Sequence, residues 1–169
     1  MDKNYLRKHN LALRKKLNQS VASDKIVSKI LLSGEFLSAE NILIFYPLKY
    51  EINLLKLLNC KEKSFYLPKV KGDYLQICPY KGNLIKGAFN IMEPDGCPVN
   101  PSFIDLAYIP SLAVDKNLNR LGYGKGYYDR LFSDTSFKAG KIAVINKELV
   151  VDKIDVSEFD IKVDGYITD

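Results

Sequence analysis

The sequence has few residues of the kinds that metal centres and covalent catalysis require. Only one histidine is present, His9, so motifs that need two histidines, such as H-E-x-x-H, are excluded. A Ser-His-Asp triad would depend on this one residue, which falls in a basic predicted helix. The cysteines Cys60, Cys78 and Cys97 are odd in number, far apart and without zinc or redox spacing. They favour a reducing cytoplasm as the location of the protein.

Long apolar segments are missing as well. No apolar run approaches the roughly 20 residues of a membrane span, and the N-terminal M-D-K-N-Y-L-R-K-H-N is too polar for a signal peptide. The net charge of +5 favours anionic ligands, but it is smaller than nucleic-acid-binding domains usually carry. We therefore expect a cytoplasmic protein that binds small molecules and neither nucleic acid nor membrane. A monomer is expected as well, although neither charge nor hydropathy bears on the oligomeric state.

What is present is an alternation of helical and strand patterns. Helices are predicted over residues 3–17 and from Ser23, as N-cap, to Gly34. Continuous apolar runs predict buried strands, and the region 80–102 is predicted to be long loops broken by little structure. The predicted strands are 41–47, 64–68, 74–79, 104–109, 141–145 and 163–168. No repeat or linker interrupts the chain, so residues 1–169 are predicted to form one three-layer α/β/α domain with a mostly parallel central sheet.

The most distinctive stretch is R-L-G-Y-G-K-G-Y-Y-D, from Arg120 to Asp129. Its three alternating glycines permit positive φ and close approach, and successive exposed N–H groups in such a loop can hold an anion. Lys125 and Arg120 add positive charge, and a short helix is predicted to follow the loop. These features predict a phosphate cradle. Asp129 could hold Mg²⁺ beside the phosphate or could be a first-turn acid that favours the helix dipole.

The loop matches neither the Walker A motif nor the Rossmann fingerprint, and a bare glycine loop can be only a tight turn. Tyr127 and Tyr128 could flank a planar ligand, or one of them could pack into the core.

Two other places in the chain offer site candidates. The first helix carries six basic residues that are mostly expected on a solvated face: Lys3, Arg7, Lys8, Arg14, Lys15 and Lys16. Of these, Lys3 and Arg7 lie four apart and could act together on an anion. Glu51 and Asn53 follow a strand at its carboxyl end, where ligands bind in open α/β sheets. Asn53 could equally be the N-cap of a helix formed by L-L-K-L-L.

The segment I-P-S-L-A-V-D-K-N-L-N-R-L-G-Y-G-K-G-Y-Y-D-R resembles the signature of the 5-formyltetrahydrofolate cyclo-ligase family, also called methenyltetrahydrofolate synthetases. The resemblance extends over nearly the whole chain. Lys3 and Arg7 look like the family's N-terminal ATP-contacting pair, and F-Y-P-L-K-Y-E-I-N looks like its first strand and folate-side loop. F-N-I-M-E-P is similar to the family's F-G-I-x-E-P, and D-I-K-V-D-G-Y-I resembles its closing segment.

The resemblance implies an enzyme with an architecture like that of ribose-phosphate isomerases and CoA transferases. It implies conversion of 5-formyltetrahydrofolate to 5,10-methenyltetrahydrofolate, with Mg²⁺ as cofactor and ATP as co-substrate. The implied catalytic residues are Lys125, Arg120 and Tyr127. The implied ATP-binding residues are Lys3, Arg7, Arg120, Leu121, Gly122, Tyr123, Gly124, Lys125, Gly126, Tyr127 and Tyr128. The implied substrate-binding residues are Leu48, Glu51, Asn53, Tyr123, Gly124, Lys125, Gly126 and Tyr127. The implied metal ligands are Asp129 and Asp160.

Some positions depart from the family pattern. Asn53 stands where the family usually has an acid, and Asn90 where it commonly has glycine. Ser111 and Val114 replace a usual glycine and phenylalanine, and residues 147–151 lack the usual proline. None of these positions lies in the glycine loop, so they bear on folate affinity more than on ATP binding.

Two other functions are alternatives to the cyclo-ligase hypothesis. A non-catalytic RNA- or nucleotide-binding module would use the basic first helix, but the chain has no ribonucleoprotein-type aromatic motif. A sugar-phosphate isomerase or acyl-transfer enzyme would share the architecture, but fold alone does not assign function. The presence of Asp129, Asp160 and Lys125 favours the enzyme over the binding module, and the stretch from Arg120 to Asp129 favours the cyclo-ligase over the isomerase or acyl-transfer enzyme. Without the resemblance, the residues alone indicate only a phosphate site with Mg²⁺.

Overall fold

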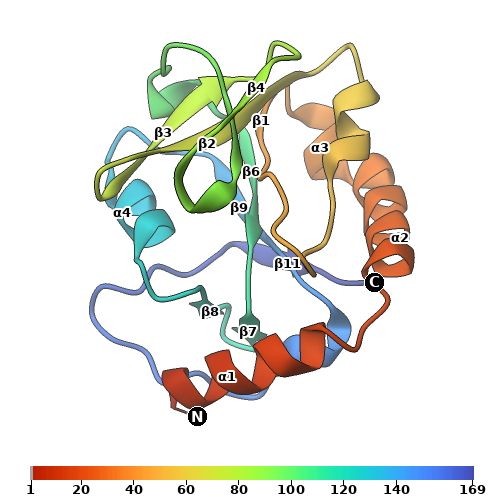
Figure 1. Ribbon diagram of the computed structural model, residues 1–169, viewed down its shortest axis with the longest axis vertical. Coiled ribbons are helices and arrows are strands. Elements are labelled where there is room, and N and C mark those ends of the chain that lie inside the picture. The colour runs from red at the N-terminus through yellow and green to blue at the C-terminus, as the bar shows by residue number, and fades with distance from the viewer. Residues whose placement is uncertain (1) are drawn as a thin grey trace.

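A six-stranded sheet forms the centre of the computed structural model, which describes residues 2–169 (Figure 1). The strand order is β11 (Gly165–Ile167), β9 (Gly140–Val144), β6 (Leu106–Pro110), β1 (Asn41–Leu43), β2 (Ser64–Lys71) and β3 (Tyr74–Pro79). Every neighbouring pair is parallel except β2 and β3, which form an antiparallel hairpin. The predicted α/β fold with a mostly parallel sheet is therefore confirmed.

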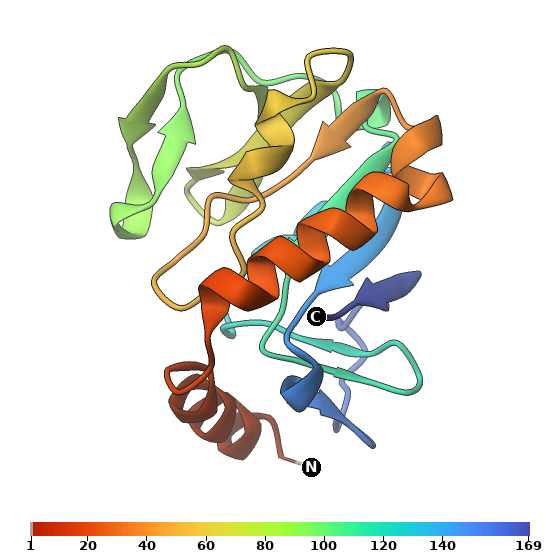
Figure 2. The same cartoon turned by 90° about the vertical axis from the view of Figure 1, so that its right-hand side faces the viewer.

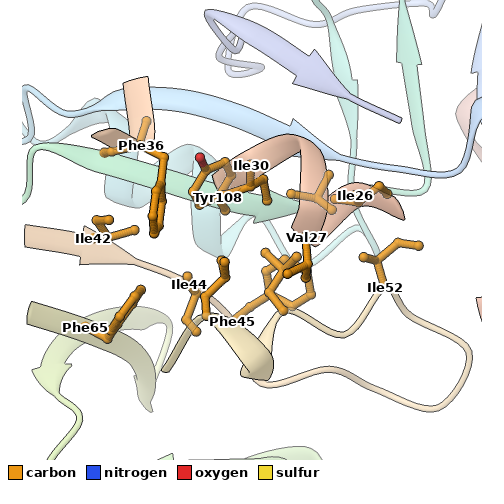
Figure 3. Close-up of a cluster of buried hydrophobic side chains, with 14 of the residues drawn as sticks. Ile26, Val27, Ile30, Phe36, Ile42, Ile44, Phe45, Ile52, Phe65 and Tyr108 are labelled. Carbon is orange, nitrogen blue, oxygen red and sulfur yellow. The ribbon is translucent and has the colours of Figure 1, made fainter. Parts of the chain in front are cut away.

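Helices cover both faces of this sheet because its strands alternate apolar side chains between them. Ile42 and Ile44 join a core cluster with Ile26 and Ile30 of α2 (Gln19–Leu32), which crosses one face (Figures 2 and 3). The short helix α3 (Gly34–Ser38) lies on this face too, with Phe36 in the same cluster. Leu43, between the two isoleucines, belongs to a second cluster with residues of α4 (Tyr127–Ser133) on the opposite face.

The first helix, α1 (Lys3–Arg14), lies at one end of the molecule beside a small second sheet (Figure 1). That sheet has the order β10 (Val150–Val151), β7 (Ala113–Asp115), β8 (Arg120–Leu121). Leu6 of α1 packs in a third buried cluster with Leu121. The small sheet therefore places the start of the glycine loop directly beside α1.

The rest of the chain forms short elements that connect the main ones. The hairpin of β4 (Leu84–Lys86) and β5 (Met92–Pro94) lies next to β2. The described residues also form the 3₁₀ turns η1 (Leu55–Asn59), η2 (Ala88–Asn90), η3 (Pro101–Phe103) and η4 (Lys147–Leu149). Among residues 2–169, no helix has both the length and the apolar character needed to cross a membrane.

Three sequence predictions about elements are wrong in detail. The second helix begins at Gln19 instead of after Ser23, because Asn18 accepts a hydrogen bond from the Val21 amide and acts as the cap. The predicted strand 41–47 pairs only over Asn41–Leu43, although residues 44 and 45 are buried, because an apolar run indicates burial and not ladder pairing. The predicted loop region 80–102 contains the β4–β5 hairpin.

Asn90, where the resemblance implies a glycine, lies in a turn with an unusual backbone conformation. Phe89 and Asn90 both have positive φ, 57° and 59°. Glycine adopts this conformation without steric cost, and asparagine is among the residues that tolerate it best. The substitution therefore preserves the turn of the β4–β5 hairpin.

A buried carboxylate holds the small sheet together. Asp115, at the end of β7, is fully buried and accepts hydrogen bonds from the amides of Asn117, Asn119 and Ile154 and from the Asn119 side chain. Burial alone would raise the pKa of the Asp115 carboxyl, but these hydrogen bonds outweigh it and hold the pKa below its usual value. The carboxylate thereby fastens the C-terminal segment to the hairpin that leads into the glycine loop.

We expect Asp115→Asn to lower the free energy of unfolding by roughly 2–3 kcal/mol at pH 7, because the amide NH₂ would face donors that the carboxylate accepts. Since the folded-state pKa is depressed, this contribution is present above the unfolded-state pKa and is lost as the pH falls through the folded-state value. The gap between wild type and variant should therefore shrink below about pH 4. Urea unfolding at neutral and acid pH measures it, with the exposed Asp95→Asn as control. A gap that does not change with pH would contradict this account.

Candidate active site

The glycine loop connects β8 to α4 and adopts a conformation that requires glycine at two positions. Gly124 has φ +95° and Gly126 has φ +68°, both in the region that side chains rarely adopt. Gly122 has ordinary φ, and there the requirement is space, because a Cβ would lie 2.8 Å from Nη1 of Arg120. The expectation that the glycines supply positive φ and room is confirmed.

Arginine side chains surround the loop. A Cβ on Gly124 would lie 3.3 Å from the Arg7 guanidinium, and one on Gly126 would lie 2.9 Å from Nη1 of Arg130. Arg7 Nε donates to the carbonyl of Gly122 at 3.1 Å, and Arg130 Nη2 donates to the carbonyl of Lys125 at 2.8 Å. Together with Arg120, these guanidinium groups make the loop strongly positive. Arg130 was not among the predicted site residues, and its only sequence signal is its place one residue after Asp129.

The loop forms one wall of a cavity of about 820 Å³. Another part of the cavity wall comes from β2, β3 and the turn between β4 and β5, and it is mostly apolar. Its apolar residues are Pro68, Val70, Leu75, Phe89 and Ile91. Such a cavity, with a charged side and an apolar side, can hold a ligand that combines a polyanion with a flat organic ring.

A buried polar network joins the loop to the segment that follows β1. Tyr123 donates its hydroxyl proton to Glu51 Oε1 at 2.7 Å, and Arg14 Nη1 donates to the Tyr123 hydroxyl at 2.8 Å. Arg14 also forms an ion pair with Glu51 at 3.6 Å and donates to the carbonyl of Ser111. Burial and the Glu51 carboxylate raise the pKa of the Tyr123 phenol, so at neutral pH it remains a donor.

Both predicted metal-ligating carboxylates lie in the cavity wall. Asp129 contacts Arg120 at 3.2 Å and accepts from the amide of Ile161 at 3.3 Å, which brings it next to the segment that carries Asp160. Asp160 accepts hydrogen bonds from Lys3 and from Ser157. Burial opposes ionisation of Asp160, but these hydrogen bonds outweigh it and lower its pKa, so the carboxylate is charged at neutral pH.

The two tyrosines that begin α4 have different environments. Tyr128 packs against Phe132, with ring centroids 5.8 Å apart, and the Arg120 guanidinium lies over its ring. Burial raises the pKa of Tyr128. Tyr127 has other contacts: it meets Phe89 edge to face at 6.2 Å and donates to the carbonyl of Gly72. The interpretation that one of the pair packs into the core is confirmed for Tyr128, and Tyr127 remains available to a ligand.

The cavity collects every predicted site residue except Lys3 and Asn53. Lys3 lies just outside it, in contact with Asp160. Asn53 is exposed, and its side-chain oxygen accepts from the amide of Leu55 at 2.9 Å at the start of η1. The N-cap of η1 is Leu54, without a side-chain cap, and Asn53 lies outside the lining of the cavity, so its contact with substrate stays a prediction.

Arg14 is the residue of this region whose environment differs most from the sequence prediction. The sequence placed it with the solvated basic residues of the first helix, whereas the structure buries it to 4% exposure. No local pattern distinguishes it from its neighbours, since its partners Glu51 and Tyr123 lie far away in the sequence.

Comparisons with known proteins agree on one family. The sequence model described as the 5-formyltetrahydrofolate cyclo-ligase family matches residues 1–169. The chain is 31% identical over 155 residues to 5-formyltetrahydrofolate cyclo-ligase of Mycoplasma genitalium, covering 85% of this chain and 84% of that protein. It is 27% identical over 176 residues to the Mus musculus enzyme of the same name, covering 93% and 85%.

Solved structures give the same result. The Aquifex aeolicus 5,10-methenyltetrahydrofolate synthetase superposes with a TM-score of 0.85 at 35% identity, covering 97% of this chain and 88% of that one. The synthetase from Mycoplasma pneumoniae superposes with a TM-score of 0.81 at 25% identity, covering 99% of each chain.

Proposed function

The chain belongs to the 5-formyltetrahydrofolate cyclo-ligase family, and we propose that the cavity beside its glycine loop is the active site. The enzyme converts 5-formyltetrahydrofolate to 5,10-methenyltetrahydrofolate. The family uses ATP for this reaction. The observation that carries the proposal is the meeting of a positively charged glycine loop and an apolar wall in one cavity.

The loop is proposed to hold the ATP phosphates. Its backbone between Gly122 and Gly126 is exposed to the cavity, and Lys125 extends from it without a hydrogen bond or ion pair to any described side chain. Phosphoryl transfer depends mainly on positioning and on neutralising the charge that develops. Lys125 and Arg7 are proposed to supply that charge, and Tyr127 to pack against the nucleotide or the pterin. Arg120 is mostly buried, so its part is to hold Asp129 and support the loop.

The pair of carboxylates Asp129 and Asp160 has the chemistry that Mg²⁺ requires. That ion binds one or two protein carboxylates and takes its other oxygens from phosphates and water. Among residues 2–169 no cluster of three or more acidic, cysteine or histidine side chains could hold a metal by itself. Asp129 and Asp160 are adjacent in the cavity wall, and Lys3 lies beside Asp160. When bound, the ion would neutralise phosphate charge and align the phosphoryl group for transfer.

The chemistry follows from the substrate. A formamide carbon is a poor electrophile, and its oxygen is a poor leaving group. Transfer of the γ-phosphoryl group of ATP to the formyl oxygen gives an iminium phosphate. Attack by N10 on the formyl carbon, loss of the N10 proton and departure of phosphate then close the ring. No protein nucleophile is needed, so the enzyme's residues only bind, orient and neutralise charge.

The wider proposals concern the whole chain. We propose that residues 1–169 act as one cyclo-ligase domain, of the architecture shared with ribose-phosphate isomerases and CoA transferases. We also propose that it acts as a monomer in the cytoplasm on reduced folate and ATP. The free state of Cys60, Cys78 and Cys97 is consistent with a reducing compartment.

Asp160→Asn is expected to raise the Mg²⁺ concentration for half-maximal activity at least tenfold, because an amide is a weak ligand for Mg²⁺. The assay mixes enzyme, ATP and 5-formyltetrahydrofolate at varied Mg²⁺ and follows the near-ultraviolet absorbance of the methenyl product. Mn²⁺ binding in the presence of ADP, measured by electron paramagnetic resonance, gives a readout that does not need turnover.

The control is Asp152→Asn, which removes an exposed ion pair with Lys116 and should change neither readout. An unchanged metal requirement in Asp160→Asn would contradict the metal assignment. Absence of the methenyl product with folded wild-type enzyme would contradict the proposed active site as a whole.

A further inference from the structure

The apolar wall of the cavity contains one carboxylate that the proposed chemistry does not use. Glu93, in the middle of β5, is only 4% exposed and lines the cavity among Pro68, Val70 and Ile91. Its hairpin lies beside the main sheet, next to β2 (Figure 2). No lysine, arginine or histidine within residues 2–169 forms an ion pair with it. A buried carboxylate without a cation is costly, which suggests that it serves a ligand.

Only one of its two oxygens is occupied. Oε1 accepts a hydrogen bond from the amide of Val70 at 3.0 Å, which fixes the carboxyl group against β2. Oε2 has no hydrogen-bond donor among the described residues. It is not fully enclosed, because the fully enclosed side-chain atoms without a partner lie on other residues, namely Arg14, Gln19, Ser111 and Arg120. Because Glu93 lines the cavity, this free oxygen is available to whatever lies against the apolar wall.

The backbone is shaped around this carboxyl group. A Cβ on Gly87 would lie 2.1 Å from both Cδ and Oε2 of Glu93, so no other residue fits there while Glu93 keeps its position. The amide of Gly87 donates to the carbonyl of Ile91 at 2.8 Å and is not available to Oε2. Gly87 therefore makes room for the carboxylate without occupying its free oxygen.

The other buried carboxylate in the cavity has no such capacity. Glu51 Oε1 accepts from Tyr123 and faces Arg14, while Oε2 accepts from the amide of Leu48 at 2.7 Å. Its charge is balanced, and each oxygen already has a partner. Glu93 is thus the carboxylate with an unused acceptor, and it is set between apolar side chains that can cover the faces of a ring.

We propose that Glu93 recognises the pterin ring of the folate by accepting a hydrogen bond from its amino and ring N–H edge. That edge presents adjacent donors, and an ionised carboxylate forms strong charge-assisted hydrogen bonds with such donors. Phe89 and Ile91 lie along the same wall, where they contact the ring faces. This inference rests on the proposed active site and adds the residue that orients the ring.

Glu93→Gln tests it, because the two possible roles of Glu93 predict opposite results. The amide can still accept from Val70, but it then turns an NH₂ group toward the pterin donors, so the dissociation constant for 5-formyltetrahydrofolate should rise at least tenfold. The dissociation constants for ADP and for 4-aminobenzoylglutamate, which lacks the pterin, should change less than twofold. The urea midpoint should stay equal or rise, because a buried unpaired charge is removed. Calorimetric titration measures each ligand.

Gly87→Ala provides a second variant that keeps Glu93 but displaces its carboxyl group, and it should reproduce the selective loss of folate binding. Glu40→Gln, exposed at the amino end of β1 and outside the cavity, is the matched control. Unchanged folate affinity in Glu93→Gln would overturn the inference. Equal losses for all three ligands together with a lower urea midpoint would overturn it too, by showing a structural role. If wild-type enzyme failed to bind folate, the active-site proposal itself would fail.

Discussion

Lys125→Ala should lower kcat by roughly 10²–10³-fold while leaving the fold intact, a loss comparable to removal of one preorganised charge-stabilising donor. The Lys125 side chain is exposed within the glycine loop and has no hydrogen bond or ion pair in the described chain. Its removal therefore leaves no other group without a partner. Its backbone carbonyl, which accepts from Arg130, remains in the variant. The loop should therefore keep its shape and lose only a positive charge next to the proposed phosphates.

The measurement is steady-state production of the methenyl compound, with circular dichroism and a urea melt to show that the variant is folded. Lys25→Ala, on the exposed side of α2 and outside the cavity, is the matched control and should retain full turnover. Lys125→Arg keeps the charge and should recover part of kcat. Near-normal turnover in Lys125→Ala would mean that the catalytic charge comes from another residue, of which Arg7 is the first candidate.

The glycine loop could be predicted from the sequence because its chemistry is local. Positive φ, close approach and charge are properties of residues within ten positions of one another, and the structure agrees at Gly124 and Gly126. The element that follows, α4, also begins where the sequence predicts it, at Tyr127. Local rules act over such distances regardless of the rest of the fold.

Other residues could not be assigned because their roles depend on distant contacts. Ser23 has the chemistry of a cap, but the structure places it inside α2, where its hydroxyl donates to the carbonyl of Gln19 and accepts from the amide of Asn53. Asn53 is in turn held at the start of η1 and not in the cavity. Each residue type permits two roles, and only tertiary packing chooses between them.

Arg14 shows the same limit with a larger energetic consequence. A helix with six basic residues predicts a solvated face, and five of the six are at least partly exposed. Arg14 is the exception, since the fold brings Glu51, Tyr123 and the carbonyl of Ser111 to its guanidinium. Arg14 therefore helps to fix the helix beside the cavity, together with Leu6, which packs on Leu121, and Arg7, which donates to the carbonyl of Gly122.

We expect Arg14→Met to lower the free energy of unfolding by about 3–5 kcal/mol, the usual cost of removing one partner from a buried ion pair. Methionine fills much of the space of the arginine stem, so lost packing contributes little. The cost arises because the Glu51 carboxylate, whose side chain is 4% exposed, loses its cation and keeps only Tyr123 and the Leu48 amide. Urea unfolding at pH 7 gives the value directly.

The double variant Arg14→Met with Glu51→Gln separates charge from shape. Glutamine can still accept from Tyr123 or from the Leu48 amide but carries no charge, so the double variant should be more stable than Arg14→Met alone. A double-mutant cycle then gives the coupling between the two residues. Additive effects of the two substitutions would show that the ion pair contributes nothing and that Arg14 acts only through Ser111 and Tyr123. If Arg14→Met does not fold, Arg14→Lys keeps the charge but cannot reach all three partners, and should be intermediate in stability.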